Sequence, residues 1–317
     1  MSITTVARRQ LTISDASQWM LRVIAAVVLL WVVTSVLLAI GRGDFSNALA
    51  TTPQLLLLAA SLYALGQLMR IVRLALLIGD ARLSLRHLAS LHLFTAGVAL
   101  GTPLRLGDAY RATEVGRTTG GTIIGFTFVW IERLFDAAII LPLLLYAASR
   151  DADEASSYTG IAFFTLLFLC LSVLIVALLP DNLRRIGTYL IRRHEGQWTI
   201  RMLRLIDEIR AVMRRIPVIL RGKIASLAAL TLLIWLFELS SFTFVTLSWH
   251  PHKDPLGGLL AFLSQTTGGG TLPDLLARAS SLDHAELAYL AGSQAPLALI
   301  ALAAALHYAR ASRRRKS

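Results

Sequence analysis

The chain has 317 residues, of which 56% are hydrophobic and 16% are charged, and its mean hydropathy is +0.64. This composition excludes an ordinary soluble globular protein. Several apolar runs approach or exceed the roughly 20 residues that a helix needs to cross hydrocarbon, and they are too long for the strands of a membrane barrel. The sequence therefore predicts an all-α, polytopic membrane helical bundle.

The formal net charge is +12, and the positions of the basic residues indicate both a partner and an orientation in the membrane. Most Lys and Arg residues fall in four segments: the N-terminus up to Arg22, residues 70–87, residues 180–223 and the tail from Arg310. The predicted loops on the opposite side carry only Arg42, Arg150 and Lys253. This asymmetry predicts a membrane protein with both termini in the cytoplasm. The basic charge would face anionic lipids, and no nucleic-acid partner is expected.

The first two membrane helices are predicted over residues 23–40 and 53–69. The second ends in Arg70 and Arg73, which we place at the cytoplasmic side. Residues 88–100 are apolar but too short to span a bilayer with ease.

The chain then breaks at Gly101-Thr102-Pro103, where Thr suits an N-cap and Pro suits the first position of a new helix. Residues 104–117 are too charged to span. We therefore predict a re-entrant hairpin over residues 88–121, which enters and leaves on the cytoplasmic side. Its structural break would consist of Gly101, Pro103 and Gly107.

The remaining membrane helices are predicted over residues 122–148, 159–179, 224–249 and 286–309. Pro180 is expected to end the second of these. The basic residues 181–223 carry apolar side chains at helical spacing, which predicts an amphipathic helix on the cytoplasmic side. This helix would either lie on the inner leaflet or pack on its own domain.

Residues 256–285 repeat the pattern of the first break, with a short apolar stretch before Gly268, Gly269, Gly270 and Pro273. We predict a second re-entrant hairpin that enters from outside. Two broken segments, one from each face, are typical of an inverted-repeat transporter with a site near the bilayer midplane. The chain would then be a single membrane domain, residues 1–317, with halves 1–158 and 159–317.

Charged residues inside the predicted membrane helices are the main candidates for a site. Glu132, Arg133 and Asp136 lie in one apolar run, and Glu238 lies in another. A charge near the bilayer centre costs about +2.5 to +3.5 kcal/mol on insertion scales and usually marks a pathway or a site. Glu132 and Asp136 share a helical face, with Arg133 beside it. The alternative is a neutralised cluster that only locks helices together.

The first break adds five charged residues at intervals of three: Arg105, Asp108, Arg111, Glu114 and Arg117. A salt-bridged helix at the water interface explains Glu114 and Arg117. Arg105 lies at the start of the half-helix, where free N–H groups favour an anion and arginine can recognise phosphate through two hydrogen bonds. The predicted lipid-binding residues are Arg105, Asp108, Arg111, Glu132, Arg133, Asp136 and Glu238.

No metal or cofactor site is predicted. His250 and His252 lack a third ligand, and Cys170 is the only cysteine. No nucleotide-binding loop and no Ser/His/Asp nucleophile motif is present. We therefore expect a protein that is not an enzyme.

The stretch GTPLRLGDAYRATEVGR, followed by a helix with IERLFDAAI, resembles the membrane domain of lysylphosphatidylglycerol synthases and of stand-alone flippase-like proteins. That family shows Pro-x-x-x-Gly-[Glu/Asp]-x-x-Arg and then Glu-Arg-x-x-Asp. The matching residues are Pro103, Gly107, Asp108 and Arg111, then Glu132, Arg133 and Asp136, with Trp235 and Glu238 later in the chain. In the family's second break Pro comes before the glycines, whereas here Pro273 follows them.

The resemblance implies a flippase-like protein of the bacterial inner (cytoplasmic) membrane that moves a phosphate-bearing or modified lipid between leaflets, with membrane lipids as its partners. The soluble aminoacyl-transferase domain of the synthases is not found in these residues, so we expect lipid handling rather than aminoacylation. Two alternatives stay open. A membrane-embedded lipid transferase would use Glu132, Asp136 or Glu238 as general base. A non-catalytic scaffold would hold an envelope-lipid biosynthesis enzyme through residues 181–223.

Overall fold

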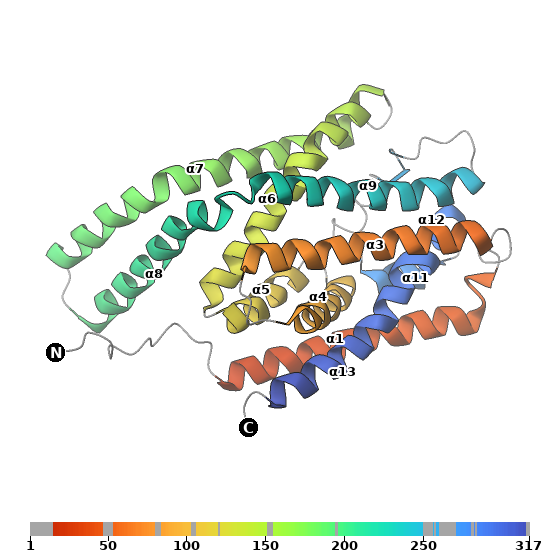
Figure 1. Ribbon diagram of the computed structural model, residues 1–317, viewed down its shortest axis with the longest axis horizontal. Coiled ribbons are helices and arrows are strands. Elements are labelled where there is room, and N and C mark those ends of the chain that lie inside the picture. The colour runs from red at the N-terminus through yellow and green to blue at the C-terminus, as the bar shows by residue number, and fades with distance from the viewer. Residues whose placement is uncertain are drawn as a thin grey trace.

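Figure 1 shows the computed structural model of the chain, whose described part is almost entirely helical. The described residues are 15–46, 53–79, 84–102, 106–119, 121–150, 155–193, 196–249, 256, 258–259, 271–279, 282 and 284–314. These ranges contain no strand, and the predicted all-α, polytopic membrane bundle is confirmed.

The helices follow the chain in a simple order. They are α1 (Asp15–Arg42), α3 (Pro53–Ile78), α4 (Leu85–Leu100), α5 (Leu106–Thr119), α6 (Thr122–Arg150), α7 (Ala155–Arg193), α8 (Gln197–Leu220), α9 (Ile224–Trp249), α11 (Leu272–Ala277), α12 (His284–Tyr289) and α13 (Ala295–Arg314). A π-helical turn, Leu290–Gln294, joins α12 to α13. In the described ranges, five helical runs are long and apolar enough to cross a membrane: α1, α3, α7, α9 and the run from α12 through α13.

The predicted helix–break–helix pattern of the first half is confirmed. α4 ends at Leu100 and α5 begins at Leu106, and the backbone N–H of Gly101 donates to the carbonyl oxygen of Val98 at 3.1 Å to close α4. Pro103 and Arg105 lie outside the described residues. Re-entry of α4 and α5 into the membrane stays a prediction.

The predicted end of the second helix was wrong. α3 continues past Met69 to Ile78, which places Arg70 and Arg73 within the bundle instead of at its cytoplasmic end. Arg73 is only 1% exposed. Both arginines pair with carboxylates on other helices, and this pairing offsets the high cost of burying a charge.

Pro180 does not end its helix, in contrast to the prediction. It lies inside α7, which continues to Arg193 and is 39 residues long. A proline within a helix removes one backbone hydrogen bond and kinks the helix without always ending it. The end of α7 and the helix α8 together form a hairpin, residues 181–220, which projects beyond the bundle at the left of Figure 1.

The predicted amphipathic segment is helix α8, and it packs against α7 and α6. A Cβ atom on Gly187 of α7 would lie 3.7 Å from Leu203 of α8, which is ordinary van der Waals contact. Ile206, Val212 and Ile216 are buried on the inner face of α8. One face of α8 therefore packs on the protein's own domain, and contact of its other face with the inner leaflet stays a prediction.

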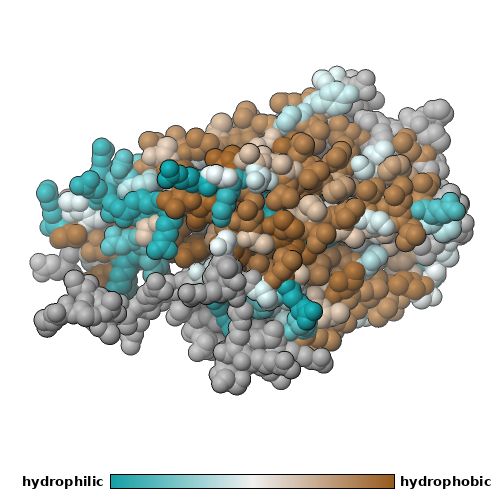
Figure 2. Space-filling view, viewed as in Figure 1, coloured by the Kyte–Doolittle hydropathy of each residue, from teal (hydrophilic) through white to brown (hydrophobic). Residues whose placement is uncertain are grey.

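The molecular surface separates into an apolar region and a polar end. Figure 2 shows brown, apolar side chains over the middle and right of the molecule and teal, polar side chains at the left, over the hairpin of residues 181–220. On α7, Phe163, Phe164 and Val173 are all more than half exposed. Large apolar side chains on the outside of a helical bundle are typical of contact with lipid.

The order of the helices is compatible with the predicted inverted repeat. In Figure 1, α1 and α7 run in opposite directions, as do α3 and α9, and α6 and α13. α3 and α9 also contact each other directly. The repeat itself, its halves 1–158 and 159–317, and the second re-entrant segment 256–285 stay predictions. Gly268, Gly269 and Gly270 lie outside the described residues.

Candidate functional site

A network of ion pairs lies inside the bundle, where α3, α5, α6 and α9 approach one another. It consists of eight side chains, which we call the charge network: Arg70, Arg73, Asp108, Arg111, Glu132, Arg133, Asp136 and Glu238. Four are cations and four are anions, so that its formal charge is zero. Because an unpaired charge in an apolar interior costs several kcal/mol, by a rough general estimate, this balance is what makes the burial tolerable.

Helices α5 and α6 contribute two ion pairs that cross between them. Nη2 of Arg111 lies 2.8 Å from Oε2 of Glu132, and Nη2 of Arg133 donates to Oδ1 of Asp108 at 2.8 Å. The three-residue spacing in α5 had suggested pairing along that helix. Instead, Asp108 and Arg111 both reach across to α6.

Arg73 of α3 lies between the two acids of α6. Its Nη1 donates to Oδ1 of Asp136 at 2.6 Å and to Oγ1 of Thr231, on α9, at 3.0 Å. Its Nε lies 3.7 Å from Oε1 of Glu132. Glu132 and Asp136 therefore do share a face of α6, as the sequence predicts, and that face is turned toward α3.

Arg133 and Asp108 form one of two accessible edges of the charge network. Their side chains are 24% and 19% exposed, whereas those of Arg73, Glu132 and Asp136 are 5% exposed or less. Nη1 of Arg133 also donates to Oδ2 of Asp136 at 2.9 Å. The Arg70–Glu238 pair forms the other edge, with side chains 19% and 14% exposed. A ligand that approaches from the surface would thus meet one of these two pairs before Arg73, Glu132 and Asp136.

Arg70 and Glu238 link α3 to α9 in a further ion pair. One helical turn before Arg70, Oε1 of Gln67 lies 3.1 Å from Nε2 of His92, which is buried on α4. Polar side chains therefore continue from the charge network to α4.

Close packing of glycines sets the spacing of α5 and α6. A Cβ atom on Gly125 would lie 2.0 Å from the carbonyl oxygen of Ala112 and 2.4 Å from the backbone nitrogen of Gly116. Only glycine permits this approach without a shift of the backbone. The approach brings the two helices close enough for the pairs Arg111–Glu132 and Asp108–Arg133 to form.

The break before α5 is also tightly packed. A Cβ atom on Gly107 would lie 2.5 Å from the Cα atom of Ala99, and one on Gly101 would lie 2.5 Å from Cγ2 of Val32. The hydroxyl of Thr102 accepts a hydrogen bond from the backbone N–H of Gly107 at 2.9 Å. These contacts give Gly101 and Gly107 the structural role that the sequence predicts for them.

Glu114 holds three helices together beside the charge network. Its carboxylate accepts from Nε of Arg22 at 3.0 Å and from the hydroxyl of Tyr308 at 2.6 Å, and Nη1 of Arg117 lies 3.5 Å away. Arg22 belongs to α1 and Tyr308 to α13. The predicted i,i+3 pair of Glu114 with Arg117 is confirmed, but its partners on α1 and α13 were not predictable from the sequence.

The second break is described only from Thr271 onward. Thr271 caps α11: its hydroxyl accepts from the backbone N–H of Asp274, and the Asp274 carboxylate accepts from the backbone N–H of Thr271 at 3.1 Å. Hydrogen bonds from Thr271 lower the pKa of the Asp274 carboxyl below its usual range. Pro273 lies at the start of α11, where proline is favoured, so this part of the break begins a helix.

The structure brings together six of the seven predicted lipid-binding residues; the seventh, Arg105, lies outside the described residues. The sequence reasoning missed Arg70 and Arg73. One signal was present, because the apolar run LALLI follows Arg73 without interruption. In the part of the chain that the structure describes, no group of three His, Cys, Asp or Glu side chains is placed to hold a metal ion.

The fold and the site define a multi-pass α-helical membrane protein with a neutral network of buried charges between its helices. The chain matches the family described as "Lysylphosphatidylglycerol synthase TM region" over residues 19–273, and it belongs to that family. The family implies a membrane protein related to lipid modification or translocation. No match to the chain was found among curated proteins or among solved structures.

Proposed function

We propose that this protein is a lipid translocase of the bacterial inner membrane, which moves a phosphate-bearing or modified lipid head group between leaflets along the charge network. The observation that carries the proposal is the graded exposure of this network. Arg133 and Asp108 are accessible at its edge, while Arg73, Glu132 and Asp136 are nearly inaccessible. Charges at such depth in an apolar bundle usually belong to a substrate pathway.

The chemistry of Arg133 suits a lipid phosphate. Its two terminal nitrogens donate to two different carboxylates, Asp108 and Asp136. A phosphate can accept both hydrogen bonds from one guanidinium, so that it would replace Asp108 on Arg133 without leaving the arginine unpaired. The Asp108 carboxylate would then lie beside the bound head group, where it would contact a cationic group on the same lipid. Arg105, two residues past the break, would add a further cation to this edge.

The proposed orientation places both termini and the hairpin of residues 181–220 in the cytoplasm. Support comes from the polar end in Figure 2, which coincides with the basic segments that the positive-inside rule assigns to the cytoplasm. The membrane-facing partners would be lipids. We propose transport without covalent change of the lipid, so that the protein would not be an enzyme.

Leaflet exchange of labelled phospholipids in proteoliposomes tests the proposal. The wild type is compared with Arg133→Gln and Arg105→Ala, and with the control Arg210→Gln, whose ion pair with Asp207 lies on α8 away from the network. The proposal expects fast exchange that Arg133→Gln reduces at least tenfold and Arg210→Gln leaves unchanged. Circular dichroism and thermal unfolding verify that each variant is folded.

Two results would oppose the proposal. Exchange that continues at the wild-type rate in folded Arg133→Gln would place the path elsewhere. A covalently altered lipid, detected by mass spectrometry of the vesicle lipids after incubation, would indicate a transferase instead of a translocase.

A further inference from the structure

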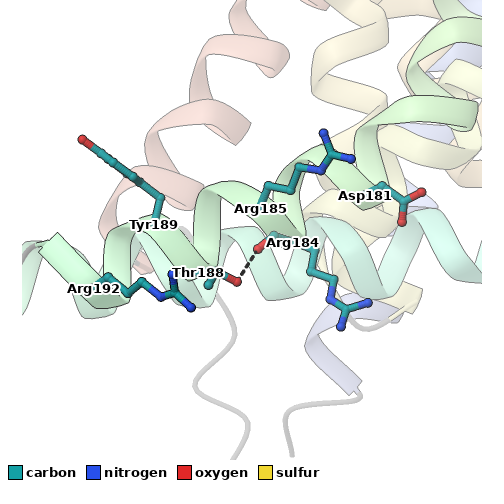
Figure 3. A pocket seen from close by; sticks show the side chains of 6 residues that line it. All are labelled: Asp181, Arg184, Arg185, Thr188, Tyr189 and Arg192. Carbon is teal, nitrogen blue, oxygen red and sulfur yellow. Dashed lines mark hydrogen bonds between the residues drawn. The ribbon is translucent and has the colours of Figure 1, made fainter.

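Beyond Pro180, α7 carries a basic face that the charge network does not use. A surface pocket of about 540 Å³ lies against this face. Its described lining residues all come from α7: Asp181, Arg184, Arg185, Thr188, Tyr189 and Arg192. They recur at intervals of three and four residues, which places them on one side of the helix. Figure 3 shows these side chains on α7, with Arg184 and Arg185 extending in different directions from the helix and Arg192 further along it.

These arginines differ from those inside the bundle in lacking carboxylate partners. Within the described residues, no acidic side chain forms an ion pair with Arg184, Arg185 or Arg192, and all three are exposed. Asp181 is the one acid among the described lining residues. Each arginine of the charge network, in contrast, has a carboxylate within ion-pair distance. The guanidinium donors of this face of α7 are therefore available to an external anion.

The position of the face indicates where that anion lies. At 1.5 Å of rise per residue, Arg184 and Arg192 lie about 6 Å and about 18 Å beyond Pro180, where the apolar run ends. The polar head groups of a bilayer begin directly outside its hydrocarbon core, so Arg184 and Arg185 would reach them from the end of the membrane span. Lipid phosphates are the anions found at that level.

Apolar side chains next to the arginines favour a lipid over an acidic protein or free phosphate. Ile186 and Ile191 are 48% and 66% exposed, although they neighbour Arg185 and Arg192 in the sequence. Exposed aliphatic side chains between arginines are typical of a helix at the membrane interface, where the aliphatic groups contact acyl chains and the arginines contact head groups.

We propose that residues 181–192 of α7 form a second lipid site, which binds the head group of an anionic phospholipid at the membrane surface. Arg184 and Arg185 would contact its phosphate, and Arg192, about 18 Å beyond Pro180, would add a more distant positive charge. This site is separate from the charge network and does not depend on lipid translocation. Basic residues directly beyond a membrane span attract anionic lipids, and each contributes to the affinity.

The test measures binding of dioctanoylphosphatidylglycerol to the purified full chain in a neutral detergent by isothermal titration calorimetry. The first variant carries Arg184→Gln, Arg185→Gln and Arg192→Gln. The matched control carries Arg201→Gln, Arg204→Gln and Arg214→Gln on α8, which removes the same number of charges from the same hairpin. We expect the α7 variant to bind on the order of a hundredfold more weakly than the wild type, and the α8 variant to bind at least tenfold more tightly than the α7 variant.

Equal weakening by both triple variants would overturn the proposal, because it indicates diffuse attraction. No weakening by the α7 variant would also overturn it. Displacement of the lipid by inorganic phosphate at equal concentration would indicate a site for free anions and would have the same consequence. Binding of a polyglutamate peptide with no binding of the lipid would assign the face to an acidic protein and would also overturn it. Because the substituted side chains are exposed, we expect both variants to fold. Should the triple variant fail to unfold cooperatively, Arg184→Gln alone must still weaken binding several-fold.

Discussion

Nη1 of Arg73 lies 2.6 Å from Oδ1 of Asp136, and both side chains are almost completely buried. The two residues belong to different helices and are 63 positions apart in the sequence. Their pairing ties α3 to α6 at the centre of the charge network. It also explains why α3 passes through its two arginines without ending.

Arg73→Met should lower the free energy of unfolding by about 3–5 kcal/mol, because it leaves buried carboxylates without their cation. The control is Arg42→Met, which removes an arginine from a pair with Asp44 where the Arg42 side chain is 54% exposed. That change should cost about 1 kcal/mol or less. Unfolding of the purified protein in detergent measures both, and similar losses from the two variants would contradict the buried pair.

A double variant separates the interaction energy of the Arg73–Asp136 pair from the effects of the two single substitutions. Arg73→Met combined with Asp136→Leu removes both partners, so the loss of stability should be smaller than the sum of the two single losses. The same unfolding measurement applied to all three variants gives the coupling energy. Additive losses would show that Arg73 and Asp136 do not interact.

Gly125→Ala should destabilise the protein by about 1–3 kcal/mol or more, because the added methyl group meets the carbonyl oxygen of Ala112. Gly160→Ala on α7 is the matched control, since no described atom lies within 4 Å of the added Cβ. It should be neutral or stabilise by up to about 1 kcal/mol, as alanine favours helix. Thermal unfolding distinguishes the two, and a harmless Gly125→Ala would show that α5 and α6 lie further apart.

Tyr308→Phe should cost about 1.5–3 kcal/mol, because it removes the hydroxyl that donates to Glu114 at 2.6 Å while it keeps the ring. Tyr110→Phe offers the same chemical change at a buried hydroxyl that has no hydrogen-bond partner in the described part of the chain. We expect no loss of stability there. Equal effects of the two substitutions would argue against the link between α13 and α5.

Cysteine labelling tests the proposed orientation. In a Cys170→Ser background, Thr188→Cys lies on the polar hairpin, and Ser46→Cys follows α1 by four residues. Figure 1 shows the C-terminal end of α1 on the side of the bundle opposite the hairpin. A membrane-impermeant maleimide should label Ser46→Cys in intact cells and Thr188→Cys only after permeabilisation. Labelling of Thr188→Cys in intact cells would reverse the orientation.

The sequence predicts helices accurately where an apolar run has clear limits. α9 covers residues 224–249 as predicted, because its apolar residues lie between Lys223 and the polar segment that starts at His250. The ends of α3 and α7 were missed for a different reason. Arg73 continues a membrane helix only because Asp136 is close in space, and no local pattern contains that information.

The sequence predicted most residues of the candidate site, but it did not predict which of them form ion pairs with one another. Glu132, Arg133 and Asp136 were recognisable because charge stands out against an apolar run. Asp108 and Arg111 were expected near them, but their partners depend on how closely Gly116 and Gly125 let α5 approach α6. That distance is a property of packing, and the sequence spacing of the charges alone does not contain it.

The equal numbers of cations and anions in the charge network have a consequence for the energetics of transport. Moving one elementary charge across a membrane potential changes the free energy by about 2.3 kcal/mol per 100 mV. The eight described side chains sum to zero charge, so their displacement together as one rigid unit would do no net electrical work. In the proposed cycle, the voltage dependence of exchange would therefore report the charge of the lipid head group itself.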